Sequence, residues 1–211
     1  TWNYAEMIGY VGILPLLLSM FSFGKRNGTV VFFWLVLFIS LLFSLPTGIS
    51  QIPYLLEIPL LSSAQPTRLL FLVCFSLSIL SAFGFEYVQD IKKIKIRHAI
   101  PIVLLVLFFA SLGMIVISKT LLIFSDLKYV GITVNNLKLP LLLLSLSTVL
   151  IIAFFLAKKK IFREVIIVFI IILTSFDLLR FANKFTPFTP AIYLYPQTKI
   201  IDFLQNQKGV F

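Results

Sequence analysis

The sequence predicts an all-α membrane protein, a polytopic bundle of about six transmembrane helices. Of its 211 residues, 60% are hydrophobic and only 12% are charged, and the mean hydropathy is +1.06, far above the value of a soluble domain of this size. The apolar residues form six continuous blocks, each near the roughly 20 residues that a helix needs to cross the hydrocarbon core. They do not alternate with polar residues, which excludes a membrane β-barrel.

The six predicted helices cover, in approximate bounds, residues 5–23, 29–45, 66–85, 100–117, 140–157 and 164–182. Pro15 is expected to kink the first of them. Three later helices carry a proline in or near the first turn, where its missing N–H removes no hydrogen bond; these prolines are Pro66, Pro101 and Pro140. We therefore expect one transmembrane domain over residues 1–182.

The chain begins with Thr1 and ends on a polar, irregular segment, and we expect it to be a fragment of a longer polypeptide. Residues 183–211 are then the start of a truncated segment outside the membrane, and the rest of the same polypeptide is a partner of this part. An irregular, proline-punctuated loop precedes the third helix. The composition gives no indication of a cofactor.

The distribution of basic residues predicts how the bundle is oriented. Ten lie in loops on one side, at Lys25, Arg26, Lys92, Lys93, Lys95, Arg97, Lys158, Lys159, Lys160 and Arg163. Six lie on the other side, at Lys119, Lys128, Lys138, Lys184, Lys199 and Lys208. The side with ten is expected to face the cytoplasm, so both chain ends face outward. The net charge of +10 thus flanks apolar blocks, which indicates contact with a lipid bilayer and no nucleic-acid partner.

Arg68 is the first candidate binding residue. It stands two residues after Pro66, at the start of an apolar run that contains no further charge until Glu86. Unpaired N–H groups at a helix start, together with an arginine, form a clamp for phosphate at the outer headgroup level. Two plainer interpretations stay open, because the same arginine can reach ordinary lipid phosphates or pair with Glu57.

Three further polar residues are candidates near the outer boundary. Asp177 and Arg180 are three residues apart on one predicted helix, a spacing that favours a structural ion pair, although ionisable groups inside membranes also serve function. Glu57 lies in the outer loop as a possible base or metal ligand, or else as an exposed carboxylate. His98 has no histidine or cysteine neighbour and is expected to be a solvated loop residue.

The chain contains no Walker A loop, no metal-ligand spacing, no Ser-His-Asp set and no glycine-rich nucleotide fingerprint. These absences count against an ATP-driven pump and against a soluble-type enzyme. They do not bear on enzymes whose donor is a membrane lipid.

Three stretches resemble bacterial YfhO-family proteins, large polytopic proteins of the GT-C glycosyltransferase type. The stretches are NYAEMIGYVGILPLLLS from Asn3, PTRLL with the helix that runs to Gly84, and the segment from Asp177 to Leu204 that contains YPQTKIIDFL. They occur in the family's order and span nearly the whole chain. The chain is thus similar to the central and C-terminal membrane part of such proteins.

The resemblance implies transfer of a sugar from a polyprenyl-phosphate carrier to a cell-envelope acceptor at the outer face of a bacterial plasma membrane. It implies that the catalytic acidic residue lies in an earlier outer loop, outside this fragment, so no catalytic residue is assigned here. By position, Arg68 becomes a contact for the carrier phosphate, with Arg180 as a second candidate and with Glu57 and Asp177 as polar residues of an outer cleft. The alternatives are a transporter or flippase of a lipid-linked substrate and a non-catalytic membrane assembly protein.

Overall fold

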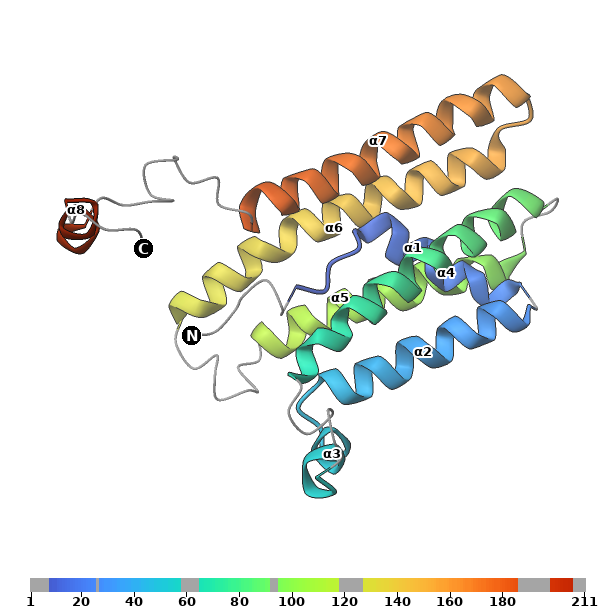
Figure 1. The fold of residues 1–211 in the computed structure, drawn as a ribbon. Coiled ribbons are helices and arrows are strands. Elements are labelled where there is room, and N and C mark those ends of the chain that lie inside the picture. The colour runs from blue at the N-terminus through green and yellow to red at the C-terminus, as the bar shows by residue number, and fades with distance from the viewer. Residues whose placement is uncertain are drawn as a thin grey trace. The chain divides into compact units, whose positions relative to one another are not determined.

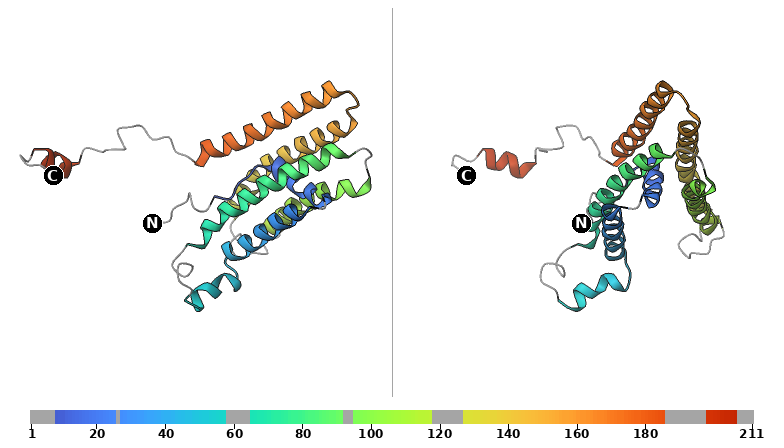
Figure 2. Two further views of the ribbon diagram at one scale, coloured as in Figure 1. Left: turned by 45° about the vertical axis from the view of Figure 1, so that its right-hand side comes forward. Right: turned by 90° about the vertical axis from the view of Figure 1, so that its right-hand side faces the viewer.

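The computed structural model describes residues 8–25, 27–57, 65–91, 95–117, 127–185 and 198–206. Within these residues the structure is all-α, as the sequence predicts, with eight α-helices and short 3₁₀ turns (Figures 1 and 2). The α-helices are α1 (Ile13–Phe21), α2 (Gly28–Ser44), α3 (Ile52–Leu55), α4 (Leu70–Asp90), α5 (Ile100–Ile117), α6 (Leu127–Leu156), α7 (Lys160–Phe185) and α8 (Lys199–Gln205). The 3₁₀ turns are η2 (Ser22–Gly24), η3 (Ile49–Gln51), η4 (Pro66–Leu69) and η5 (Ile96–Ala99).

The chain divides into two compact units, Thr1–Leu179 and Arg180–Phe211. The first unit holds the helix bundle. In the second unit, α8 is capped by the Thr198 hydroxyl, which accepts a hydrogen bond from the backbone N–H of Ile201. Asp202 lies in the first turn of α8, where its charge is favourable beside the positive end of the helix dipole.

Three described helices are long and apolar enough to cross a membrane, over Pro66–Asp90, Val134–Leu156 and Lys160–Lys184. A fourth crossing forms if α2 is joined to the segment Ile49–Leu55, from which it is bent by 79°. The segments Ile13–Gly24 and Ile100–Met114 are apolar but shorter. The protein is therefore a multi-pass membrane protein with three or four long spans among its described residues.

Two ends of the bundle in the first unit can be distinguished (Figure 1). At one end α4 finishes, α5 begins, α6 finishes and α7 begins; we call it the basic end, because it carries Lys25, Lys95 and the run Lys158–Lys160. At the other end α2 finishes and η4 opens α4; we call it the Arg68 end. Successive helices of the bundle run in opposite directions, as expected for a chain whose loops lie alternately at the two ends.

The first helix differs from the expectation of a span over 5–23. Residues 8–12 are not helical, and α1 begins at Ile13 because Gly12 has φ 89°, a left-handed conformation that ends any helix there. Residues 5–7 lie outside the described residues. Pro15 therefore stands in the first turn of α1 and is not a kink in mid-helix. The run Ile13–Gly24 is only about 18 Å long at 1.5 Å per residue, too short for a core of about 30 Å.

The fifth predicted helix was also bounded wrongly, because α6 begins at Leu127 and contains Pro140 in its interior. A proline there removes one backbone hydrogen bond, but Leu137 and Leu139 on its N-terminal side pack against the main core, and this contact stabilises a continuous helix. The predictions for α2 and α5 are confirmed to within a residue. Helices α4 and α7 extend beyond the predicted ends, to Asp90 and to Phe185.

The core lies around α1, which packs most extensively against α4. Leu17 of α1 is fully buried, and buried apolar residues of α4, α5, α6 and α7 belong to the same core cluster as the helix. The two backbones approach closely at Gly84, where an added Cβ would lie 1.7 Å from the carbonyl oxygen of Leu18. Small residues allow such close helix crossings in membranes, so Gly84 fixes the position of α4 on α1.

Candidate functional site

The Arg68 end contains the first candidate residue. Arg68 lies on η4, one turn of 3₁₀ helix that has Pro66 at its first position and no side-chain cap from Gln65. Its side chain is exposed, and its backbone N–H donates to the carbonyl of Gln65 over 3.1 Å. The neighbouring Thr67 hydroxyl is buried without a hydrogen-bond partner among the described residues. This arrangement places a cation and an uncapped helix start together, which suits a phosphate oxygen.

Asp177 occupies a different kind of place, inside the bundle. It is 4% exposed, and its two carboxylate oxygens accept hydrogen bonds from segments near the start of α1. Oδ1 accepts from the Tyr10 hydroxyl over 2.6 Å, and Oδ2 accepts from the backbone N–H of Ile13 over 2.9 Å. Asp177 is therefore the cap of α1, supplied by α7 from 164 residues away in sequence.

The capping geometry explains the backbone around it. An N–H at the start of a helix has no partner within the helix, and a carboxylate there also interacts favourably with the helix dipole. A Cβ on Gly12 would lie 3.3 Å from Oδ2 of Asp177, so a side chain at this position would crowd the carboxylate as well as strain the backbone. The ion pair expected between Asp177 and Arg180 is replaced by these hydrogen bonds. Arg180 itself is exposed on α7.

Glu57 lies in the turn that follows α3 and is exposed. Its φ of 48° is in the left-handed region, which a glutamate adopts only at some cost. Among the described residues no group of three potential metal ligands forms. The exposed Arg68 and Glu57 and the buried Asp177 are thus in different environments, and a shared outer cleft stays a prediction.

The segment before α1 links Asp177 to the start of α4. A Cβ on Gly9 would lie 3.3 Å from Cδ2 of Leu70, the first residue of α4, and Gly9 is four residues before the capped Ile13. Asp177 and η4 are therefore at the same end of the first unit. As a hydrogen-bonded cap, however, the Asp177 carboxylate is not available as a base.

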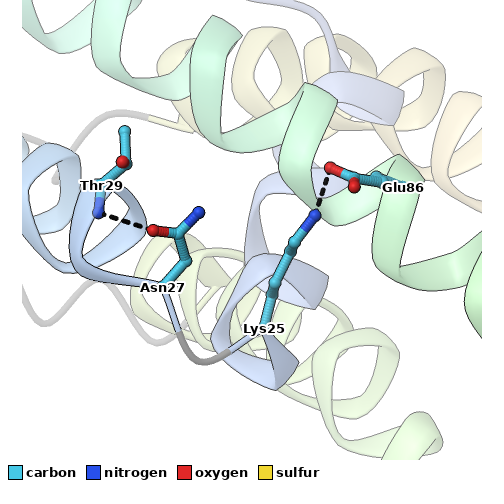
Figure 3. Close-up of polar contacts among 4 residues, drawn as sticks. All are labelled: Lys25, Asn27, Thr29 and Glu86. Carbon is cyan, nitrogen blue, oxygen red and sulfur yellow. Dashed lines mark hydrogen bonds and ion pairs between the residues drawn. The ribbon is translucent and has the colours of Figure 1, made fainter.

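The basic end contains polar contacts that the sequence reasoning missed. Figure 3 shows Lys25, after η2, paired with Glu86 of α4, and the Asn27 side chain accepting a 3.0 Å hydrogen bond from the backbone N–H of Thr29. The ammonium of Lys25 also lies 5.3 Å from the centre of the Phe83 ring. The turn between α1 and α2 is thereby attached to α4.

His98 is not a solvated loop residue, and that expectation is wrong. It is 6% exposed, its ring stacks against Phe155, and its Nδ1 accepts a 3.0 Å hydrogen bond from the backbone N–H of Lys95. Its Nε2 is 3.4 Å from the Tyr87 hydroxyl. No local signal marks this contact, because Tyr87 and His98 lie on opposite sides of a chain reversal.

The fold and these sites define a multi-pass α-helical membrane protein whose apolar helices contact the lipid bilayer. Its described polar groups include an exposed arginine at one end, a buried carboxylate cap beneath that end, and a histidine–tyrosine contact at the other. Comparison with protein-family models, with curated proteins and with solved structures finds no match to the chain.

Proposed function

We propose that the chain is part of a membrane glycosyltransferase that moves a sugar from a polyprenyl-phosphate carrier to a cell-envelope acceptor. The single observation that carries the proposal is the exposed Arg68 on the uncapped turn that opens α4. A carrier phosphate at the headgroup level is a suitable ligand for this turn, because guanidinium and backbone N–H groups both stabilise phosphate oxygens. The same groups would stabilise the anionic carrier that leaves during transfer.

The topology in this proposal has six membrane-crossing segments. The α5 segment and the short α1, which the non-helical residues 8–12 continue, complete the three or four long spans. The basic end faces the cytoplasm because of its excess of Lys and Arg, and the Arg68 end faces outward. Both chain ends are then extracytoplasmic. The catalytic acid is supplied by the rest of the same polypeptide.

The experiment measures sugar transfer and carrier binding separately, in membranes that contain the full-length protein. Arg68→Ala is expected to reduce transfer from radiolabelled polyprenyl-phosphate hexoses at least tenfold, because hydrogen bonds to a charged group contribute about 1.5–3 kcal/mol. Arg68→Lys keeps the charge but not the fork of donors, and should retain an intermediate rate. Lys160→Ala is the matched control, since that side chain is 90% exposed at the basic end.

Equal membrane levels of all variants show that insertion is intact. Transfer by Arg68→Ala within threefold of the wild-type rate, with normal binding of polyprenyl phosphate, contradicts the assignment. Normal transfer by Lys160→Ala would show that the loss in Arg68→Ala comes from the position of Arg68 and not from the removal of a positive charge as such.

A transporter or flippase of a lipid-linked substrate is the second candidate, and one observation favours it. The short α1 begins inside the bundle with its N-terminus at a carboxylate, and helix N-termini that lie within the membrane form substrate sites in secondary transporters. Reconstituted protein that moves a fluorescent polyprenyl phosphate between leaflets, without any sugar transfer, would select this alternative. The measurement is the fraction of probe that a membrane-impermeant reductant bleaches.

A further inference from the structure

A pocket of about 330 Å³ lies at the basic end of the first unit. The end of α1 with η2, the last turns of α4 and the first turns of α5 form its wall. Met20, Phe21 and Leu104 supply apolar surface to the wall, and polar and apolar atoms contribute about equally to the whole lining. The volume is near the lower limit of ordinary small-molecule sites, roughly 300–1,000 Å³, so the pocket has room for the head and first carbons of an amphiphile.

Gly24 determines where the Tyr87 hydroxyl lies. A Cβ on Gly24 would be 2.2 Å from Cζ of Tyr87, the ring carbon that carries the hydroxyl. The polar end of the tyrosine therefore rests against the backbone of Gly24, and both residues line the pocket. A glycine at this position is what allows the phenol to lie at the wall.

His98, which also lines the pocket, determines the direction of the hydrogen bonds. Because its Nδ1 accepts the Lys95 N–H, the neutral ring carries its proton on Nε2. That Nε2–H faces the Tyr87 oxygen at 3.4 Å and donates to it. The hydroxyl proton of Tyr87 has no acceptor among the described residues, and it is available to a ligand in the pocket.

The residues that line the pocket favour an uncharged ligand. The residues that line it include no lysine, arginine, aspartate or glutamate. Lys25, next to Gly24 in the chain, is neutralised by its ion pair with Glu86. A phosphate here would lose its hydration without gaining an unpaired cation from these residues, whereas a neutral carbonyl needs only one donor.

We propose that this pocket binds the carbonyl head of an uncharged amphiphile, with the Tyr87 hydroxyl as donor and the apolar wall around the first carbons of its tail. The carbonyl comes either from the ester of a diacylglycerol-type lipid or from an isoprenoid quinone. The pocket is at the end opposite Arg68, and the proposal is independent of sugar transfer.

The test titrates the full chain in dodecyl maltoside, a detergent without a carbonyl group. Dioctanoylglycerol, decyl-ubiquinone and dioctanoyl phosphatidic acid are added separately, and bound ligand is counted by native mass spectrometry. We expect one molecule of an uncharged ligand to bind saturably and phosphatidic acid to bind at least fivefold more weakly. Tyr87→Phe should weaken binding about fivefold, the usual effect of losing one neutral hydrogen bond.

Leu104→Trp fills the pocket and should weaken binding at least tenfold, whereas Leu107→Trp should bind as the wild type does. Leu107 is the matched control for Leu104, since both lie on α5 and their exposed fractions are similar, 58% and 49%. Only Leu104 lines the pocket. Thermal unfolding of each variant checks that it is folded. Binding of only dioctanoylglycerol identifies a lipid source, and binding of only the quinone identifies a quinone source.

Three results would overturn the proposal. The first is saturable binding of neither uncharged ligand to the wild-type chain. The second is undiminished binding to folded Leu104→Trp and to Tyr87→Phe. The third is tighter binding of phosphatidic acid than of dioctanoylglycerol.

Discussion

Removal of the Asp177 carboxylate should release the start of α1. In Asp177→Ala the backbone N–H of Ile13 loses its acceptor in a buried site, which costs about 1.5–3 kcal/mol for a hydrogen bond to a charged group. Loss of the negative charge at the helix N-terminus adds roughly 0.3–2 kcal/mol. The free energy of local opening at Ile13 should thus fall by about 3 kcal/mol, and its amide should exchange at least 100-fold faster.

The assay is hydrogen exchange followed by mass spectrometry on the peptide that covers the start of α1, with the protein in nanodiscs. Asp177→Asn keeps one oxygen that can accept from the Ile13 N–H, but it loses the charge and replaces the second acceptor, which Tyr10 uses, by an amide donor. It should therefore accelerate exchange by about tenfold, less than Asp177→Ala. Arg180→Ala is the control from the same helix, and should leave the exchange of Ile13 unchanged because the carboxylate is held by Tyr10 and Ile13.

Wild-type exchange at Ile13 in Asp177→Ala would refute the capping role. Equal acceleration by Arg180→Ala and Asp177→Ala would instead restore the ion-pair interpretation.

Three further predictions concern the packing of the bundle, each measured by thermal unfolding in detergent. Gly84→Ala should lower the stability by more than about 2 kcal/mol, the upper part of the range for overpacking, because its Cβ would overlap the Leu18 carbonyl. The control Gly28→Ala, with nothing within 4 Å of the added Cβ, should leave the stability unchanged. Equal effects of the two substitutions would contradict the close helix crossing at Gly84. Ser22→Ala should lower the stability by about 1–3 kcal/mol, because the Trp34 indole N–H loses its acceptor at 3.0 Å. The control Ser145→Ala, on an exposed face, should change the stability little. An unchanged stability of Ser22→Ala would show that the indole N–H finds another acceptor. Glu86→Gln should cost less than about 1 kcal/mol, since Glu86 is 54% exposed and solvent screens its pair with Lys25; a larger loss would mean that the pair is shielded by lipid.

Much of the helical architecture follows from local pattern. The apolar run of α2 after the Asn27 cap and that of α5 around Pro101 give bounds that match the structure. The unusual start of α1 had one local indication, since a proline in the first turn marks the start of a helix and Pro15 occupies that position. Pro140, in contrast, led to a wrong start for α6, because it lies inside the helix and packing on both sides of it maintains the helix.

The contacts at the sites are less predictable, because they join residues far apart in sequence. The spacing of Asp177 and Arg180 indicates a local pair, but the carboxylate accepts from Ile13, and only the folded bundle brings these two residues together. His98 likewise is buried by Phe155 of α6 and by Tyr87 of α4. Arg68 could be placed at the mouth of a helix from its neighbours alone, since Pro66 fixes the start of η4.

The capping of α1 by α7 also constrains the order in which the protein can be assembled. The N–H of Ile13 must enter the membrane long before Asp177 has been synthesised, and during this interval it has no carboxylate to accept its hydrogen bond. An unsatisfied backbone group is costly in hydrocarbon, so α1 reaches its final state only when α7 is inserted. A chain that lacks α7 therefore has a backbone N–H at Ile13 without this acceptor.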